Sequence, residues 1–116
     1  MSRDPAYLID LDNAAVKIMQ FTQGLDATAF SADPLKQSAV LYQFTICGEA
    51  ARRLSAEFKA QHPEIPWSQV IAFRNRVTHD YANVDLQIVW SIITDEISKL
   101  RAQLAPLLPI AGGRPG

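Results

Sequence analysis

The sequence contains few of the residues that form disulfides or metal centres. Its 116 residues include one cysteine, Cys47, and two histidines, His62 and His79. A single cysteine excludes an intrachain disulfide. Without clustered carboxylates near either histidine, the sequence also offers no obvious metal site. Cys47 falls inside an apolar helical pattern, so we expect it to be a core residue rather than a nucleophile.

An excess of charge is also missing. The formal net charge is −1, which argues against a polycation that coats DNA or an anionic membrane but is compatible with a small basic site. Residues 1–10 lack the basic and apolar segments of a signal peptide, and no apolar run is long enough to span a membrane. We therefore expect a cytoplasmic protein without membrane association, and the sequence indicates no cofactor.

Apolar side chains at helical spacing are the dominant feature that is present. They make up 48% of the residues, which is enough to form a buried core. The pair Asp4-Pro5 predicts a helix start, because Asp can cap free N–H groups and Pro suits the first turn. Gly24 is the expected end of this helix. Its predicted core positions, three or four residues apart, are Leu8, Leu11, Ala15, Ile18 and Thr22.

A second helix is predicted to begin at Asp33-Pro34 and to run to about Phe58 or Ala60. Before it, residues 25–32 form a connection with room for one helical turn that packs Phe30. Gly48 interrupts the second helix, and a close approach of another helix would explain a glycine there. Glu49 continues a partly apolar face, so we expect either an arginine partner or a solvated position at the edge of that face.

Two further helices follow a proline-rich loop at residues 62–66. One begins near Trp67, and the other begins after Asp85, a candidate cap, and ends at the prolines from Pro106 onward. The predicted fold class is all-α: an up-and-down bundle of four main helices with short connections. It forms a single domain over residues 1–108, and residues 109–116 form a flexible tail.

Polar chemistry is concentrated in one stretch of the third helix, Phe73–Tyr81. Arg74 and His79 are five residues apart, which is about 140° around a helix, so a rigid helix does not direct both at one atom. They converge either if the helix ends or unwinds near His79 or if a two-fold dimer brings two copies together. The alternative is an arginine and a histidine on the solvated edge of a helix, without a function.

Arginine and histidine together suffice for cleavage of RNA by its own 2′-hydroxyl. A histidine with an unperturbed pKa of about 6.5 can give or take a proton near neutral pH. A guanidinium can hold a phosphate in a fork and offset the charge that develops on it. This reaction needs no metal. We expect the neighbouring Asn75, Arg76 and Thr78 to support the pair and to contact RNA.

A wider pattern surrounds this stretch. Read in order, the blocks are Arg3-Asp4…Tyr7-Leu8…Asp10, Gly48-Glu49-Ala50-Ala51…Leu54-Ser55, Pro63-Glu64-Ile65-Pro66-Trp67, Arg74-Asn75…His79-Asp80-Tyr81…Val84-Asp85 and Val89-Trp90. Over residues 3–108 this order and spacing resembles the HepT-like toxins of the HEPN superfamily. The sequence departs from the family pattern at Tyr42 and Thr45, where an arginine and a glutamate are expected.

The resemblance implies a HEPN-like helical bundle that dimerises and pairs two Arg-x4-His motifs across a shared cleft. Active members are metal-independent endoribonucleases and toxins of type VII-like toxin-antitoxin pairs, and Arg74 and His79 match their catalytic pair. Asn75 matches the polar residue after the arginine. Tyr81 matches the tyrosine that accepts AMP from a cognate MntA-type minimal nucleotidyltransferase, which would neutralise the toxin. From its residues alone, Tyr81 reads instead as a core aromatic.

Two other functions stay open beside the nuclease. One is a non-catalytic HEPN helical module that binds a nucleotidyltransferase partner or a nucleotide and cuts nothing. The other is a helical protein that only oligomerises, as a homodimer or a larger assembly. A charge near zero favours the module over a nuclease of broad specificity, whereas the intact Arg74 and His79 motif favours the nuclease.

Overall fold

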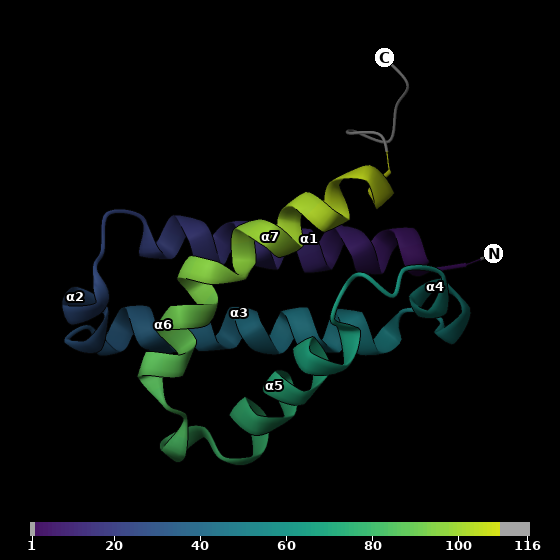
Figure 1. The fold of residues 1–116 in the computed structure, drawn as a ribbon. Coiled ribbons are helices and arrows are strands. Elements are labelled where there is room, and N and C mark those ends of the chain that lie inside the picture. The colour runs from purple at the N-terminus through teal and green to yellow at the C-terminus, as the bar shows by residue number, and fades with distance from the viewer. Residues whose placement is uncertain (1, 110–116) are drawn as a thin grey trace.

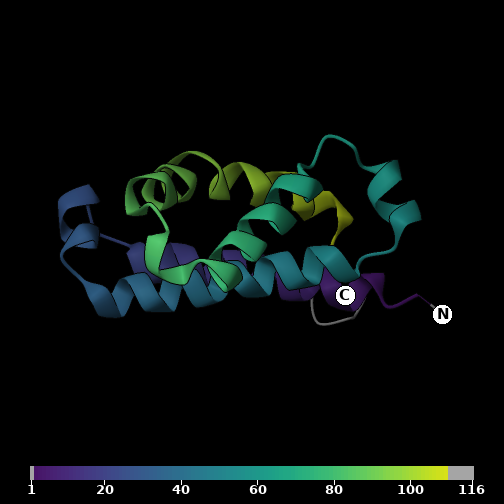
Figure 2. The same ribbon diagram turned by 90° about the horizontal axis from the view of Figure 1, so that it is seen from below.

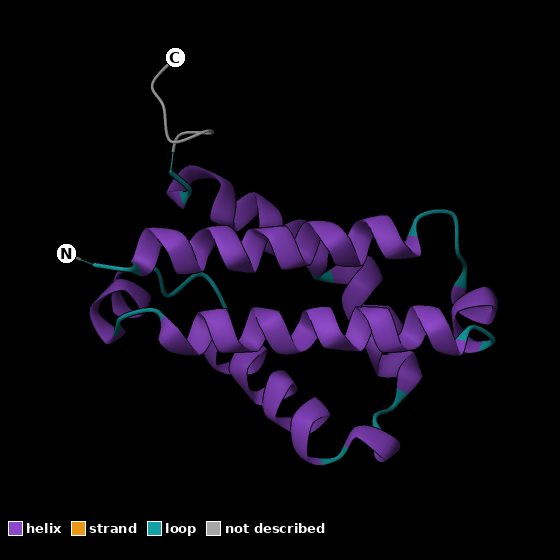
Figure 3. Ribbon diagram, turned by 180° about the vertical axis from the view of Figure 1, so that it is seen from behind, coloured by secondary structure: helices purple, strands orange, loops and turns teal. Residues whose placement is uncertain are grey.

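The computed structural model describes residues 2–109, and every regular element in that range is a helix (Figure 3). This confirms the all-α class. The predicted tail, 109–116, lies outside the described residues except for Pro109. The elements are α1 (Asp4–Thr22), α2 (Ala27–Ser31), α3 (Pro34–Arg53), α4 (Ala56–Gln61), α5 (Trp67–His79), a 3-10 turn (Tyr81–Asn83), α6 (Leu86–Asp95), α7 (Ile97–Leu104) and a second 3-10 turn (Ala105–Leu107).

The helices form two layers. The long helices α1 and α3 lie side by side and antiparallel (Figure 1). Seen from below, α5, α6 and α7 cover one face of this pair (Figure 2). Helix α5 packs on α3, α6 packs on α2, and α7 packs on α1. The short α2 and α4 lie at the two ends of the long pair (Figure 1).

The core lies between the two layers, and the predicted helical spacing is confirmed there. The predicted core positions of the first helix are all buried, and so are Phe30 and Cys47. Burial of this kind stabilises a protein by about 1.5–3 kcal/mol for each large apolar side chain. The buried face of α1 is formed by Leu8, Leu11, Ala14, Ala15, Ile18 and Thr22.

The predicted end of the second helix is wrong. Helix α3 ends at Arg53, Leu54 turns to an extended backbone (ψ 145°), and a new helix begins after Ser55. The Ser55 hydroxyl accepts a hydrogen bond from Phe58 N at 3.1 Å, as a helix cap. Ser55 N and Oγ both donate to the carboxylate of Asp4, at 2.9 and 2.7 Å. Asp4 therefore fastens the start of α1 to this break instead of capping α1.

The fourth predicted helix is divided in two. Asp85 caps α6 as predicted, and its carboxylate accepts from Gln87 N at 2.9 Å. At Glu96 the backbone (φ −113°, ψ −30°) leaves ideal helical geometry, and the chain continues as α7 in another direction (Figure 1). The break lets α6 face α2 while α7 faces α1. One straight helix does not follow both surfaces.

Candidate functional site

The predicted site residues lie on the last two turns of α5 and in the 3-10 turn that follows. Phe73 and Val77 face inward, and the Phe73 ring meets Phe44 of α3 edge-on, with ring centroids 5.0 Å apart. The remaining side chains of these turns therefore point away from the core. Exposed here are Asn75, Arg76, Thr78, His79 and Tyr81.

Arg74 lies where α5 closely approaches Gly48 of α3. A Cβ atom added to Gly48 would lie 2.0 Å from the Cβ of Arg74 and 3.2 Å from the carbonyl oxygen of Val70. Only glycine leaves room for this approach, as the interruption of the second helix had predicted. The stem of Arg74 is therefore held against the α3 backbone.

The guanidinium of Arg74 has two partners in the same chain. Nη2 lies 3.3 Å from Oε1 of Glu49, and Nη1 donates to Oδ1 of Asn75 at 2.9 Å. The prediction of an arginine partner for Glu49 is confirmed. An arginine has five N–H groups, and within residues 2–109 only one of those of Arg74 makes a hydrogen bond. The Arg74 side chain is 27% exposed, which leaves it accessible but restrained.

Glu49 also binds two arginines of its own helix. Arg52 Nη2 and Arg53 Nε lie 2.7 and 2.8 Å from Oε2 of Glu49. The hydrogen bonds from Arg52, and then those from Arg53, lower the pKa of Glu49 to about 2. Three guanidinium groups therefore surround one carboxylate. On a chain with a net charge of −1, this cluster is the small basic site that composition had left open.

His79 is the last residue of α5 and is exposed. Within residues 2–109 its side chain makes no hydrogen bond or ion pair, and the same is true of Arg76 and Thr78. The helix is intact through His79, so the predicted separation of about 140° from Arg74 applies. Unwinding does not bring the two side chains together, and a second copy of the chain is the route that stays open.

Tyr81 is half exposed, at 52%, on the turn that follows α5. The interpretation of Tyr81 as a core aromatic is therefore wrong. Its hydroxyl donates to Oγ of Ser38 on α3 at 3.2 Å. Asn83 Nδ2 donates to Oδ1 of Asp80 at 2.8 Å, and this bond holds the turn closed. The phenol is thus presented to solvent by a short structured turn.

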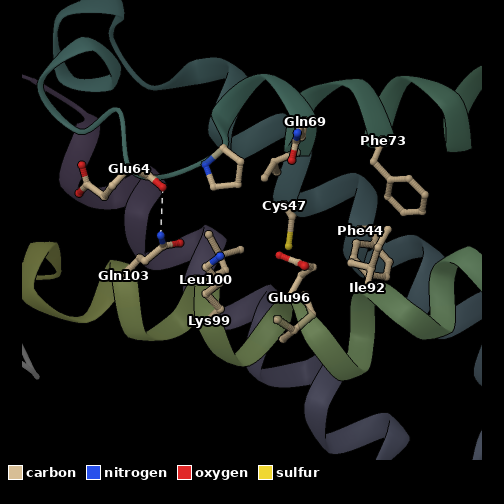
Figure 4. Close-up of a pocket in the computed structure, with 13 residues that line it drawn as sticks. Phe44, Cys47, Glu64, Gln69, Phe73, Ile92, Glu96, Lys99, Leu100 and Gln103 are labelled. Carbon is tan, nitrogen blue, oxygen red and sulfur yellow. Dashed lines mark hydrogen bonds between the residues drawn. The ribbon is translucent and has the colours of Figure 1, made fainter.

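The main cavity lies elsewhere, between α3, α5 and the α6–α7 pair (Figure 4). It has a volume of about 240 Å³ and a mostly apolar lining that includes Cys47. Burial raises the pKa of the Cys47 thiol to about 12, which keeps it protonated at neutral pH and confirms a core role. On the rim, Gln103 Nε2 donates to the carbonyl of Glu64 at 3.0 Å (Figure 4).

Two other classes of site are absent from residues 2–109. Among the described residues there is no group of three or more His, Cys, Asp or Glu side chains placed to hold a metal ion. In the same part of the chain, no helix is both long and apolar enough to cross a membrane.

Sequence reasoning missed part of this arrangement. It did not include Arg52 and Arg53 among the partners of Glu49, although their spacing of three and four residues is the one at which helical side chains meet. It also missed Ser38, since no local signal links a serine on α3 to Tyr81 on a turn 43 positions away. That contact depends on the tertiary packing of α5 on α3.

Comparisons with known proteins agree on one family. The model of the family described as "Ribonuclease HepT-like" matches residues 11–107. A protein of Thermococcus cleftensis named "Probable ribonuclease HepT" is 33% identical over 101 residues, which cover 87% of this chain and 92% of that protein. A protein of Methanocaldococcus jannaschii provisionally named as an RNase is 27% identical over 99 residues, covering 85% and 91%. No solved structure matches the chain significantly.

Proposed function

This chain belongs to the HepT-like ribonuclease family, and on that premise we propose that it is a metal-independent endoribonuclease of a type VII-like toxin-antitoxin pair. The observation that carries the proposal is how the Arg74 side chain is held and which of its donors are used. Its stem is fixed against Gly48 and its guanidinium is oriented by Glu49 and Asn75, yet within residues 2–109 only the N–H that meets Asn75 makes a hydrogen bond.

The reaction follows from the chemistry of this pair. The 2′-hydroxyl oxygen attacks the adjacent phosphorus while a base removes its proton, and the bond from phosphorus to the 5′-oxygen breaks. The leaving oxygen takes up a proton, so the products are a 2′,3′-cyclic phosphate and a 5′-hydroxyl. His79 transfers the protons, a role worth about 10²–10⁴-fold in rate. Arg74 stabilises the charge that develops on the phosphate oxygens.

The active unit of this proposal is a homodimer. Within one chain Arg74 and His79 lie on an intact helix and point about 140° apart. A two-fold axis beside the exposed end of α5 would place the His79 of one copy near the Arg74 of the other. The cleft would then hold two arginines and two histidines, with Asn75, Arg76 and Thr78 around them to contact RNA.

The proposal includes control through Tyr81. A cognate MntA-type nucleotidyltransferase would transfer AMP from ATP to the phenol oxygen and release pyrophosphate. The 52% exposure of Tyr81 and the exposed hydrogen bond from its hydroxyl to Ser38 support such access. The added adenylate would bring bulk and negative charge close to the position of the RNA phosphate, and like charges repel. Cleavage would then stop without any change in Arg74 or His79.

One observation favours a second function, the non-catalytic module that binds a nucleotidyltransferase or a nucleotide. Catalytic histidines are usually oriented by a hydrogen bond to a third group. His79 has no such partner within residues 2–109. A partner subunit would supply one in the nuclease, whereas the module needs none.

The test is RNA cleavage by the purified, unmodified chain in EDTA, compared with His79→Ala and Arg74→Ala. We expect the wild type to leave 2′,3′-cyclic phosphate ends and each variant to lose at least about a hundredfold in rate. Size-exclusion chromatography and circular dichroism should show an unchanged dimer and fold. Equal activity in all three proteins, with Tyr81 shown unmodified by mass spectrometry and several RNA classes tried, would favour the binding module.

A further inference from the structure

A second, smaller hollow lies between α1 and α3, next to the arginine cluster. Its volume is about 190 Å³. Helix α1 contributes an aromatic ring and a carboxylate. Helix α3 contributes two apolar side chains, together with the carboxylate of Glu49 and a guanidinium. The lining residues of this groove are Tyr7, Asp10, Ile46, Glu49, Ala50 and Arg53.

We infer that this groove is an RNA subsite that binds the nucleotide next to the cleaved phosphate. The inference deepens the proposed function and rests on it. It also assigns a purpose to Tyr7 and Asp10, two residues of the block Arg3–Asp10 that the pair Arg74 and His79 does not use. This block and the block Gly48–Ser55 are distant in the sequence, and the antiparallel packing of α1 on α3 brings them together.

The groove adjoins the catalytic arginine through one carboxylate. Glu49 lines the groove and also binds Arg74, which lies on α5. Oε1 of Glu49 contacts Arg74 at 3.3 Å, while Oε2 contacts Nε of Arg53 at 2.8 Å. Two guanidinium groups therefore lie on the two oxygens of the same carboxylate. A strand whose phosphate meets Arg74 has its neighbouring nucleotide within reach of Arg53.

The chemistry of the lining matches a single-stranded nucleotide. An aromatic ring such as Tyr7 offers a face on which any base can stack, which is worth about 1–3 kcal/mol in single-strand binders. The exposed carboxylate of Asp10 can accept a hydrogen bond from the amino group of a base. The Arg53 side chain lies beside Glu49 and is 53% exposed, so a phosphate can reach its guanidinium. Glu49 keeps this arginine in place before RNA arrives.

The chain offers a matched pair of variants to test this inference. Arg52 and Arg53 both pair with Glu49, Arg52 through both oxygens and Arg53 through Oε2. They are almost equally exposed, at 54% and 53%, but only Arg53 lines the groove. The probe is a single-stranded 2′-O-methyl RNA, which lacks the attacking hydroxyl, so binding to the unmodified full chain is measured without cleavage. Affinity is measured at several salt concentrations.

We expect Arg53→Gln to weaken binding about tenfold and to lower the slope of log affinity against log salt by about 0.7. Arg52→Gln removes the same charge and should weaken binding markedly less. Equal weakening by the two variants would overturn the inference, because charge alone would then explain it. No effect of Arg53→Gln would also overturn it.

Tyr7 supplies a second, independent variant pair. Tyr7→Phe keeps the ring and loses only the hydroxyl, whereas Tyr7→Leu removes the stacking face; Tyr7→Leu should weaken binding at least fivefold more than Tyr7→Phe. Since Tyr7 also packs against the core, thermal unfolding must show that Tyr7→Leu is folded at the assay temperature. Equal affinities of the two variants would contradict stacking in the groove.

A parallel assay on unmodified RNA separates this inference from the proposed function. Cleavage by the wild type together with equal binding by Arg52→Gln and Arg53→Gln would overturn the groove and leave the nuclease intact. If the wild type cleaves none of the RNAs, the nuclease is overturned, and with it the assignment of the groove to the nucleotide beside a cleaved phosphate.

Discussion

Two ion pairs join helices that are distant in the sequence, and they differ in construction. Asp12 of α1 and Arg101 of α7 form two parallel hydrogen bonds, Nε to Oδ1 at 2.9 Å and Nη2 to Oδ2 at 3.3 Å. Glu49 of α3 and Arg74 of α5 share one contact, at 3.3 Å. The Asp12 side chain is 13% exposed, whereas Glu49 is 30% exposed.

The difference separates an ion pair that stabilises the packing of two helices from an ion pair that positions an arginine for a ligand. In the Asp12–Arg101 pair both carboxylate oxygens are engaged by one guanidinium, a geometry that fixes α7 on α1. Glu49 divides its two oxygens among three arginines, so Arg74 shares its carboxylate with Arg52 and Arg53. The first pair therefore stabilises the fold, and the second positions the guanidinium of Arg74 for a ligand.

The largest expected effect comes from neutralising the arginine of each pair in turn. Arg74→Gln should lower the rate of RNA cleavage about 10²–10³-fold and change the melting temperature little. Arg101→Gln should leave the buried Asp12 carboxylate without its partner and lower the free energy of unfolding by about 1–3 kcal/mol. Below its melting temperature this variant should still cleave RNA.

Cleavage rates and chemical denaturation of both variants test whether Arg74→Gln mainly loses activity and Arg101→Gln mainly loses stability. If Arg101→Gln loses cleavage while fully folded, or if Arg74→Gln is mainly unfolded, the two ion pairs do not have the separate roles proposed for them.

The second prediction concerns Gly48, the position that lets α5 reach Glu49. Gly48→Ala adds a Cβ that would lie 2.0 Å from the Cβ of Arg74. Alanine favours a helix by about 1 kcal/mol over glycine, but this overlap forces α5 outward. We expect a net loss of about 1–3 kcal/mol in the free energy of unfolding and a loss of cleavage beyond the unfolded fraction.

Gly24→Ala is the matched control for Gly48→Ala. Gly24 has a φ of +79°, so alanine is strained there, but no atom lies within 4 Å of an added Cβ. Both variants should be destabilised in thermal unfolding, and only Gly48→Ala should reduce cleavage per folded molecule. Equal reductions would show that Gly48 acts through stability alone.

Helical spacing predicted most of the fold because burial repeats every three or four residues within each helix. The breaks were missed at Leu54 and Glu96, where the spacing continues across the end of a helix. At Leu54 the cause is a contact between Ser55 and Asp4, 51 residues away. At Glu96 it is the need of α6 and α7 to cover different helices. Neither long-range cause leaves a local signal in the sequence, although Ser55, which caps α4, is a local signal for the new helix that was overlooked.

The candidate site was predictable to a similar depth. Gly48 and Glu49 carried local signals, a helix-weakening glycine and a carboxylate on a partly apolar face, and both led to a correct structural prediction. The exposure of Tyr81 and its hydrogen bond to Ser38 were not predicted, because a tyrosine after an amphipathic helix fits the core equally well. The roles of Arg74 and His79 stay predictions until cleavage is measured.

The smallest expected effect concerns how the carboxylate of Glu49 makes stability depend on pH. The folded-state pKa of Glu49, about 2, lies below its ordinary value of 4.5. A group with a lowered folded pKa contributes stability that is present above about pH 4.5 and is lost as the pH falls toward 2. Glu49→Gln lacks this contribution, so the difference in the free energy of unfolding between wild type and variant should shrink over that range.

Denaturation by urea between pH 7 and pH 3 measures this difference. If the difference between wild type and Glu49→Gln does not change with pH over that range, the carboxylate does not hold its arginines in solution. Arg74 would then be free before RNA binds, and the contrast with the Asp12–Arg101 pair would rest on exposure alone.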